Sequence, residues 1–512
     1  MRRAVQPEAS AGRLGRTGLG NVEPVPENHS AVAVGGTLPD PWPAPTAPGR
    51  VVGSVRVPGS KSLTNRHLVL AALTDGPTVL RGALRSRDAD LMRAALETLG
   101  ARFAELTDGA LRVRGLPVGA PLPHEVHIDC GLAGTVMRFV PFVAALRPGV
   151  VHIDGDPEAR ARPMGATVSA LRQLGVQVAE LGEPGRLPLT LVVPHRDASA
   201  TGPAEVAIDA SASSQFLSGA LLSGWRLPGG LTLRHTGARV PSPEHVAMTV
   251  RLLAEHGITT TQPDGQTWRL CCTAAARPVE SGGTTARPPG SDGAERPGER
   301  VIEPDLSNAG VFLSAAAVTG GRVSVPNWPS ATTQIGARWP AILEAFGARV
   351  EHTVTDATGV LTVHGPVDAA GRPRLRGAGE LADTAELAPT VAALALLAEG
   401  PTSLTGIGHL RGHETDRLAA LAAEAARFGV SVREGADRLD FPGTRVSGAP
   451  RPATAQTYRD HRMATFAAIL GLAVPGTHVV DVGTTAKTMP DFPARWTRLV
   501  TPTPPTTKEP RR

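Results

Sequence analysis

The chain has 512 residues, too many for one hydrophobic core, so at least two domains are expected. With 41% apolar and 19% charged residues, it has the composition of a globular protein rather than a disordered or fibrous one. The net charge is only +5, no basic block is present and aromatic residues make up 3%, which argues against a nucleic-acid-binding tail or stacking platform.

Three segments lack the periodicity of helices and strands. Residues 1–48 are rich in Pro, Gly and Ala and are predicted to be a disordered leader. Residues 274–300 are predicted to be a low-complexity insert, and residues 501–512 a disordered tail.

Between these segments one sequence pattern recurs: the apolar end of a predicted helix, a glycine, and then the alternating pattern of a strand. The glycine is suited to the left-handed conformation that ends a helix, and the alternation indicates a half-buried strand. The copies lie at 99–103, 174–178, 256–258, 346–350 and 428–432.

Each copy belongs to a larger unit with the order strand, helix, strand, helix, strand, strand. In the first unit these elements are expected at 51–57, 62–73, 77–83, 87–99, 101–106 and 110–115. The later units are expected at 126–193, 206–272, 301–364, 374–441 and, in shortened form, 453–500. Six units divided by the insert predict an α/β protein with two domains of three units each. An ordinary doubly wound α/β chain is the alternative.

Lysine is rare in this chain and occurs only at positions 61, 487 and 508. Arginine supplies the other cationic side chains, so a retained lysine indicates a need for a compact ammonium whose pKa can shift on burial. Lys61 and Lys487 lie at small-residue turns beside hydroxyl groups, where a phosphate can be held, whereas Lys508 lies in the tail.

The first predicted helix of each unit opens on residues suited to binding an anion. Helix starts present free N–H groups and partial positive charge, although Ser and Thr there are also ordinary caps. The openings are at 59–62, 131–135, 211–215, 306–310, 383–386 and 459–462. The cations near helix starts are Lys61, Arg66, Arg138, Arg162, Arg417, Arg462 and Lys487. Cations gathered in one cleft would repel each other, so this pattern favours a substrate with several negative charges; solvated surface arginine is the alternative.

Two acidic residues, Glu386 and Glu414, stand among these cations. Each is a candidate general acid or base, and each is equally well explained as an ion-pair partner of a residue such as Arg417. The sequence His413-Glu414-Thr415-Asp416-Arg417 lacks the second histidine of a zinc-binding HExxH motif.

The cysteines are Cys130, Cys271 and Cys272. An odd number with two adjacent positions indicates neither a disulfide framework nor a zinc site, and is typical of a reducing cytoplasm. No secretory signal is evident in residues 1–48, and no apolar run approaches the roughly 18 residues that span a bilayer. A cytoplasmic protein is therefore expected.

Several motifs occur along the chain in the order PGSKSLTNR, GLAGTVMRF, ARP at 161–163, SSQFLSGALL, HETDR, RDHRMA and TAKTMPDF. Together and in this order they resemble the 5-enolpyruvylshikimate-3-phosphate synthase family, the 3-phosphoshikimate 1-carboxyvinyltransferases, and the resemblance covers about 51–500. It implies two inside-out, barrel-like α/β domains, each of three βαβαββ repeats, with the active site in the cleft between them. Domain I would comprise 49–58 and 301–500, and domain II 59–273.

The resemblance also implies an activity: transfer of the enolpyruvyl group of phosphoenolpyruvate to the 5-hydroxyl of shikimate 3-phosphate, with release of phosphate, in aromatic amino acid biosynthesis. No cofactor or metal is implied. Phosphoenolpyruvate would be bound by Lys61, Gly134, Arg162, Gln215, Arg417, Arg462 and Lys487. Shikimate 3-phosphate would be bound by Lys61, Ser62, Arg66, Ser213, Ser214, Gln215, Ser242, Glu386 and His413.

By the same resemblance, Glu386 would be the base for the hydroxyl, and Glu414 and Lys61 are the candidates for handling the proton at C3. Asp383 competes with Glu386, which is preferred by counting back from Gly400. His413 stands where many relatives have lysine, which predicts pH-sensitive binding near neutrality. Leu132 stands where asparagine is frequent, so no side-chain ligand is expected there.

Two alternatives remain open on the sequence. A UDP-N-acetylglucosamine enolpyruvyl transferase would share the fold but usually carries a reactive cysteine in a mobile loop. A non-enzymatic basic protein that binds phosphate or nucleic acid would show salt-sensitive affinity. A monomer that binds only small-molecule substrates, and neither nucleic acid nor membrane, is the expectation.

Overall fold

A computed structural model describes residues 38–196, 202–271 and 298–501. The expected leader up to residue 37, the insert from 274 to 297, the tail from 502 and Cys272 lie outside the described residues. The residues described from Leu38 onward belong to one structural unit.

The described strands form six small sheets, five with four strands and one with three. In the second repeat, β6 (Val126–Asp129) pairs parallel with β7 (Gly149–Asp154), which pairs antiparallel with β9 (Leu189–Val193). Strand β8 (Gln177–Glu180) then pairs antiparallel with β9. The other four-stranded sheets have the same order, so the predicted α/β repeat of strand, helix, strand, helix, strand, strand is confirmed.

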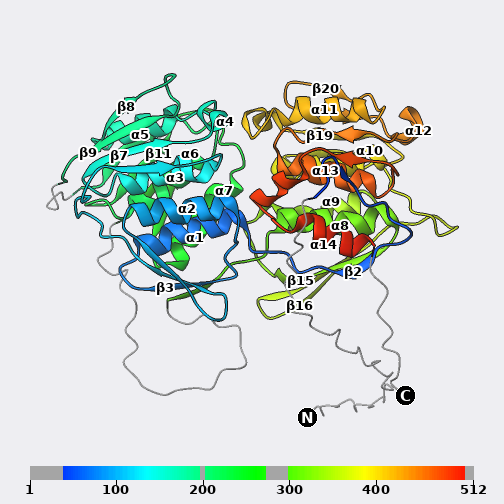
Figure 1. Ribbon diagram of the computed structural model, residues 1–512, viewed down its shortest axis with the longest axis horizontal. Coiled ribbons are helices and arrows are strands. Elements are labelled where there is room, and N and C mark those ends of the chain that lie inside the picture. Colours follow the sequence, from blue (N-terminus) through cyan, green and yellow to red (C-terminus); the bar gives the residue numbers. More distant parts are fainter. Residues whose placement is uncertain (1–37, 197–201, 272–297, 502–512) are drawn as a thin grey trace, which may run out of the picture. The chain divides into compact units, whose positions relative to one another are not determined.

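One half of the molecule follows residues 61–271 and ends with 299–301 (Figure 1, blue to green). Its other elements are α1 (Lys61–Leu73), β3 (Thr78–Arg81), α2 (Arg87–Thr98), β4 (Arg102–Glu105), β5 (Leu111–Arg114), α3 (Gly134–Ala144), α4 (Pro157–Arg160), α5 (Gly165–Gln173), β10 (Ala204–Ile208), α6 (Gln215–Gly224), β11 (Leu231–His235), α7 (Glu244–Glu255), β12 (Thr260–Asp264), β13 (Thr267–Leu270) and β14 (Glu299–Val301).

The other half is formed by residues 306–500 and two short N-terminal strands (Figure 1, mainly yellow to red). Its elements are β1 (Trp42–Pro43), β2 (Val52–Ser54), α8 (Leu306–Thr319), β15 (Arg322–Pro329), η1 (Ile335–Arg338), α9 (Trp339–Ala345), β16 (Arg349–Thr355), β17 (Thr358–His364), β18 (Gly379–Ala382), η2 (Ala385–Leu387), α10 (Ala388–Leu397), β19 (Thr402–Thr405), η3 (Gly408–Gly412), α11 (Arg417–Arg427), β20 (Arg433–Glu434), β21 (Leu439–Phe441), α12 (Thr444–Ser447), β22 (Thr454–Ala455), α13 (His461–Gly471), β23 (His478–Val479), η4 (Val482–Lys487) and α14 (Phe492–Val500).

Helices occupy the interior of each half. Every residue of α3 and of α8 is buried, and both sequences are apolar around most of the helix surface. A helix of this kind has no face for solvent and is stable only when surrounded by other elements. Two separate hydrophobic cores result, one around α3 and α6 and the other around α8, α10 and α13.

The two halves exchange a strand. Strand β2 pairs in parallel with β15, and β14 pairs in parallel with β3. The expectation that 51–57 is the first strand of the first repeat is therefore wrong: its paired residues belong to the sheet of the fourth repeat. The expected end of the insert at residue 300 is also wrong, because β14 begins at Glu299. We propose that the chain divides into two domains near the expected boundaries, with crossings at 55–60 and 302–305.

The predicted leader extends too far along the chain. Strand β1 completes the three-stranded sheet by pairing antiparallel with β23, and the Trp42 side chain is buried in the second core. Backbone hydrogen bonds from Ala44 N to Thr477 O (3.0 Å) and from Ala47 N to Leu472 O (3.2 Å) continue this attachment. Residues 38–48 therefore belong to the fold.

We expect Trp42→Ala to lower the free energy of unfolding by about 3 kcal/mol, because it empties a site in which the indole is 5% exposed. Denaturant unfolding measures this loss. Val446→Ala removes an apolar side chain that is 79% exposed and serves as the control, with an expected change of less than about 0.5 kcal/mol. Equal effects of the two substitutions would contradict the placement of Trp42 in the core.

A buried histidine pair predicts acid sensitivity. His67 on α1 and His256 at the end of α7 lie 3.5 Å apart between Nδ1 and Nε2. Burial lowers the pKa of His67 to about 4. Burial and the neighbouring His67 lower the pKa of His256 to about 3. An unfolded histidine titrates near 6.5, so between pH ~6.5 and ~4 the unfolded chain binds more protons and stability falls as the pH falls.

His256→Gln should reduce the stability lost between pH 7.5 and pH 5 by about 2 kcal/mol, as measured by denaturant unfolding at both pH values. His152→Gln on β7, where the imidazole is partly exposed, is the matched control and should leave the pH-dependent loss unchanged. An unchanged loss in His256→Gln would refute the assignment.

Candidate active site

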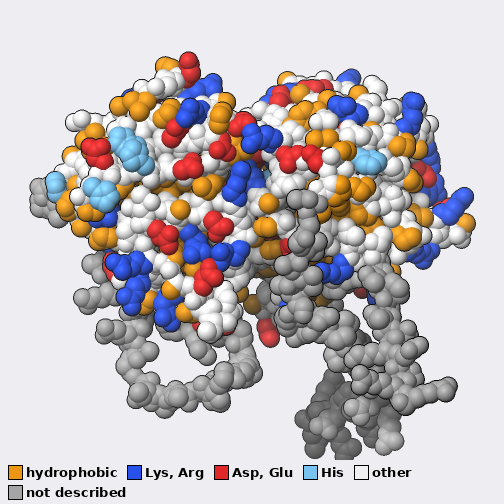
Figure 2. Space-filling model, in the orientation of Figure 1, with side chains coloured by type: hydrophobic (Ala, Val, Ile, Leu, Met, Phe, Trp, Pro, Cys, Tyr) orange, Lys and Arg blue, Asp and Glu red, His pale blue; other side chains and the backbone are white. Residues whose placement is uncertain are grey.

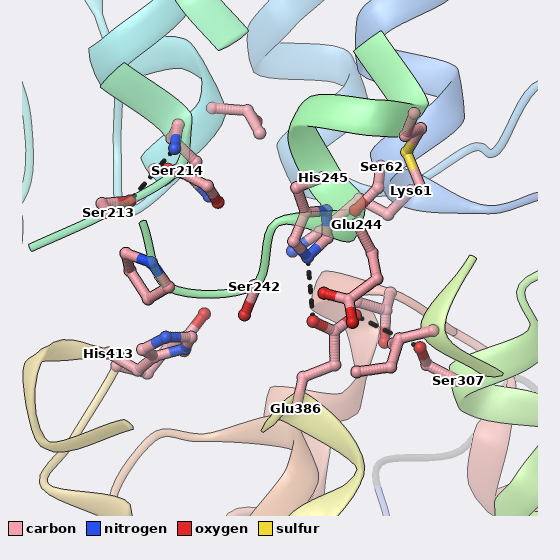
Figure 3. A pocket seen from close by; sticks show the side chains of 18 of the residues that line it. Lys61, Ser62, Ser213, Ser214, Ser242, Glu244, His245, Ser307, Glu386 and His413 are labelled. Atoms are coloured by element: carbon pink, nitrogen blue, oxygen red, sulfur yellow. Dashed lines mark hydrogen bonds and ion pairs between the residues drawn. The ribbon is translucent and has the colours of Figure 1, made fainter. Parts of the chain in front are cut away.

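A pocket of about 1190 Å³, open to solvent, is lined by residues of both halves. All the candidate substrate-binding and catalytic residues from the sequence line it: Lys61, Ser62, Arg66, Gly134, Arg162, Ser213, Ser214, Gln215, Ser242, Glu386, His413, Glu414, Arg417, Arg462 and Lys487. Figure 3 shows several of these side chains around the pocket, from α1, from η2 and from the loops before α6, α7 and α11. Asp383 is absent from the lining of this pocket and lies 3.2 Å from Arg239 instead.

Capped helix starts bring these residues together. Ser60 accepts a hydrogen bond from Leu63 N at the start of α1, and Asp305 accepts one from Asn308 N at the start of α8. Asp416 and Asp460 cap α11 and α13 in the same way. A helix start directs backbone N–H groups and partial positive charge toward an anion. The predicted gathering of helix starts is thus present.

Arg417 is fixed by two carboxylates. Its Nε donates to Asp460 Oδ2 (2.7 Å) and its Nη2 to Glu414 Oε2 (2.9 Å). Burial alone would lower the pKa of this guanidinium, but Asp460 and Glu414 outweigh burial and raise it. Arg417 therefore stays charged although its side chain is fully buried.

Glu414 lies between two cations. Its Oε1 accepts a hydrogen bond from Lys487 Nζ at 2.5 Å, while its Oε2 faces Arg417. Burial raises the pKa of a carboxyl group, but Lys487 and Arg417 outweigh this effect and hold the pKa of Glu414 well below its ordinary value. The side chain is thus an anion that orients two cations of the pocket.

Lys61 is the first residue of α1. Its Nζ lies 3.6 Å from the buried carboxylate of Asp88 on α2, and its backbone N–H donates to Asp305 Oδ2 (3.4 Å). Burial lowers the pKa of Lys61, although Asp88 opposes the shift. An ammonium group with a lowered pKa can release its proton more readily than an exposed lysine.

Arg138 and Arg162 form the wall beside Gly134. Arg138 Nη1 donates to Gln215 Oε1 (2.8 Å), and Arg162 Nη1 to the backbone oxygen of Leu132 (3.3 Å). The Leu132 side chain itself is buried. Within the described residues, the Nε atoms of both arginines are buried without a hydrogen-bond partner. Unsatisfied buried donors of this kind are suited to binding an anion.

Glu386 has a donor or cation at each carboxylate oxygen. His245 Nε2 lies 2.9 Å from Oε2, Ser307 Oγ donates to Oε1 (3.2 Å), and Arg462 Nη2 lies 3.6 Å from Oε1 (Figure 3). Burial raises the pKa of this group, but His245 and then Arg462 hold the pKa of Glu386 well below its ordinary value. An ionised carboxylate facing a cavity is suited to accept a proton from a bound hydroxyl.

Arg66 is held mainly by its own half of the molecule. Its Nε donates to Thr249 Oγ1 (2.8 Å), and its Nη2 to Ser218 Oγ and to the backbone oxygen of His245 (both 3.2 Å). Its Nη1 donates to the backbone oxygen of Ser62 (3.0 Å). The guanidinium thus braces the starts of α1 and α7 as well as lining the pocket.

His413 lies beside a cation in the unliganded protein, and the expected pH sensitivity of binding through this residue stays a prediction. The Nδ1 of His413 lies 3.2 Å from Arg417 Nη1, so the imidazole faces a permanent cation. Burial and then Arg417 lower the pKa of His413 well below its ordinary value. The side chain is consequently neutral in the neutral pH range and acts as an acceptor for Arg417.

Several contacts within the site were not predicted from the sequence, although Ser307 and Asp460 lie in the predicted helix openings. Asp88 pairs with Lys61, Asp460 with Arg417, and both His245 and Ser307 contact Glu386. His245 follows Ser242 by three residues at the start of α7, which was the available signal. The signal for Asp460 was its position as the acidic residue in the predicted helix opening at 459–462.

Positive charge prevails in the pocket. The cations of its lining are Lys61, Arg66, Arg138, Arg162, Arg417, Arg462 and Lys487. The carboxylates are Glu244, Asp305, Glu386 and Glu414. Among the residues that the structure describes, no group of His, Cys, Asp or Glu side chains is placed to hold a metal ion. The lining is thus suited to a ligand with more than one negative charge.

Sequence comparison gives the same family throughout. A family model for EPSP synthase (3-phosphoshikimate 1-carboxyvinyltransferase) matches residues 45–496. Curated proteins named 3-phosphoshikimate 1-carboxyvinyltransferase match from Kocuria rhizophila (48% identical, covering 90% of this chain and 97% of that protein) and Mycobacterium ulcerans (45%, 90% and 98%). One from Bifidobacterium longum is 43% identical, covering 90% of this chain and 98% of that protein.

Solved structures share the fold. An EPSP synthase from Acinetobacter baumannii has a TM-score of 0.67 at 22% identity, covering 89% of this chain and 97% of that one. The enolpyruvyl transferase NikO from Streptomyces tendae has a TM-score of 0.61 at 18% identity, covering 89% and 96%. With its repeats, its motifs and these relatives all in agreement, the chain belongs to the EPSP synthase family.

Proposed function

We propose that the protein transfers the enolpyruvyl group of phosphoenolpyruvate to the 5-hydroxyl of shikimate 3-phosphate and releases phosphate. The observation that carries the proposal is a cationic pocket lined by every substrate-binding and catalytic residue that the resemblance implies. Both substrates are multiply charged anions, and the lining offers several arginines, two lysines and four capped helix starts.

In the proposed assignment, phosphoenolpyruvate lies against Arg162, Gly134, Gln215 and Arg417, with Arg462 and Lys487 near its phosphate or carboxylate. Shikimate 3-phosphate lies against Ser62, Arg66, Ser213, Ser214, Ser242 and His413. Lys61 lies where it can reach both ligands. The alignment of the two anions in one pocket lowers the entropic barrier to their reaction.

The reaction requires two proton transfers. As the hydroxyl oxygen bonds to C2, its proton passes to Glu386, while C3 gains a proton from the ammonium group of Lys61. When phosphate then departs from the tetrahedral intermediate, Lys61 or the ionised carboxylate of Glu414 takes a proton from C3 and the double bond is restored. Glu386 is suited to the first step because it is ionised and lines the pocket, whereas Asp383 lies outside the pocket lining and pairs with Arg239.

The two alternatives are less well supported. Cys130 is buried, burial raises the pKa of its thiol, and neither Cys130 nor Cys271 lines the pocket, so the described residues offer no reactive cysteine there. On the face shown in Figure 2, basic and acidic side chains are interspersed, unlike the continuous basic surface of a nucleic-acid-binding protein. A monomer and a cytoplasmic location remain predictions. None of the described helices has the length and apolarity to cross a membrane.

Phosphate release by the purified protein tests the function. Phosphoenolpyruvate and shikimate 3-phosphate are supplied singly and together, and release is expected only when both are present. Release with UDP-N-acetylglucosamine in place of shikimate 3-phosphate, or none with a folded protein, would overturn the proposal.

Glu386→Gln should lower kcat at least 100-fold and change either KM by less than about fivefold, because the amide cannot take the hydroxyl proton. Asp383→Asn, its neighbour outside the pocket, should stay within about threefold of the unsubstituted protein. Steady-state kinetics with both substrates varied gives these values. The opposite ranking of the two variants would make Asp383 the base.

Gly134→Ala should raise the KM for phosphoenolpyruvate at least tenfold. A Cβ at this position would lie 2.9 Å from Arg162 Nη2, so the guanidinium must move. Gly165→Ala is the matched control, since Gly165 also begins a helix and its Cβ would meet only Gly185 Cα at 3.8 Å. An unchanged KM in Gly134→Ala would remove Arg162 from the binding site of phosphoenolpyruvate.

A further inference from the structure

His245 and Glu386 join the two halves of the molecule inside the pocket. His245 lies in the first turn of α7, and Glu386 lies in η2. Their side chains meet at 2.9 Å and are 19% and 14% exposed (Figure 3). No sequence motif of the family as given above includes His245.

A buried hydrogen-bond network fixes the backbone of His245. The backbone oxygen of His245 accepts hydrogen bonds from Arg66 Nη2 (3.2 Å), Thr249 Oγ1 (2.9 Å) and Ser218 Oγ (3.4 Å). These donors fix the first turn of α7, so the direction of the His245 side chain is set by the core rather than by solvent. The histidine can therefore impose a position on Glu386.

Glu386 is restrained on both oxygens. An ionised carboxylate accepts hydrogen bonds but donates none, so the short contact at Oε2 requires the proton of His245 to be on Nε2. Ser307 donates to the other oxygen, Oε1. One oxygen is thus held by an imidazole and the other by a rotatable hydroxyl, and only the second can readily give way to a substrate hydroxyl.

We propose that His245 is the positioning residue of the proton-accepting carboxylate: its Nε2–H holds Oε2 of Glu386 so that Oε1 faces the acceptor hydroxyl. The inference rests on the proposed function. In the step concerned, the substrate O–H bond breaks and an O–H bond forms on Oε1, while the hydroxyl oxygen forms its bond to C2. The π bond between C2 and C3 breaks at the same time, and C3 takes up a proton. The imidazole keeps its Nε2 proton throughout.

The same contact sets how basic Glu386 is. Burial raises the pKa of this carboxyl group, and His245 is the strongest influence that lowers it. The other charged or titratable groups acting on the pair are Arg66 from α1, Asp305 before α8, His409 and His413 around η3, Arg417 from α11 and Arg462 from α13. Glu244 and Lys61 also line this pocket.

The sign of the pH effect follows. Glu386 must be ionised to accept a proton, so activity falls when the pH drops below its pKa. Without the imidazole, burial is less opposed and the pKa of Glu386 rises. The acid limb of the kcat profile must then move to higher pH.

Two substitutions separate the hydrogen bond from the basic ring. His245→Leu removes both the N–H donor and the basic imidazole, and should lower kcat at least tenfold, move the acid limb to higher pH and leave both KM values within about threefold. His245→Gln keeps an N–H donor without the basic imidazole, and should restore kcat to within about fivefold while the acid limb stays at the higher pH. His152→Gln, on β7 and outside the pocket, should change neither quantity.

A double-substitution cycle completes the test. If His245 acts through Glu386, His245→Leu adds less than about twofold to the loss already caused by Glu386→Gln. Additive losses, or an unmoved acid limb in a folded His245→Leu variant, would overturn the proposal. An unsubstituted protein that releases no phosphate would instead overturn the proposed function.

Discussion

Repulsion among the cations around one pocket is the main constraint on this structure, and the surrounding residues must offset it. Cations at these distances repel each other strongly where water is excluded. Glu414 lies between Lys487 and Arg417, and Glu386 between His245 and Arg462, so each carboxylate stabilises two basic groups. Asp460 has two roles as well, since it caps α13 and also binds Arg417. Acids placed at helix starts thus allow arginines to remain charged and oriented beside them.

This arrangement also explains which carboxylates are ionised before any ligand arrives. Both Glu386 and Glu414 have lowered pKa values because basic neighbours outweigh the effect of burial. An anionic ligand bound to the same cations weakens their hold on the carboxylates and raises those pKa values. The proton-accepting strength of the pocket therefore grows when the pocket is filled.

Much of the fold could be predicted because the repeated unit leaves a regular trace in the sequence. Apolar helices, their terminal glycines and alternating strands recur in each unit, and the helix starts carry the motif residues. The partner of a strand leaves no such trace: 51–57 has the same pattern whichever sheet it joins. The repeat pattern alone therefore placed it in the first sheet and not beside β15, although the resemblance grouped 49–58 with 301–500. Trp42 lies in a two-residue strand, too short to show any period. The contact of His245 with Glu386 spans 141 positions and depends on the placement of the two halves.

The exchanged strands affect how the chain folds during synthesis and whether fragments of it can fold alone. The first sheet of residues 61–271 lacks an edge strand until β14 has been added, and β2, near the start of the chain, has no partner until β15 exists. During synthesis, when only the first half of the chain has left the ribosome, β2 is present without its partner β15, and β3 is present without its partner β14. Two fragments separated between 271 and 298 would each contain a strand that belongs to the other. Neither is a complete folding unit, and we expect them to become stable only by associating with each other.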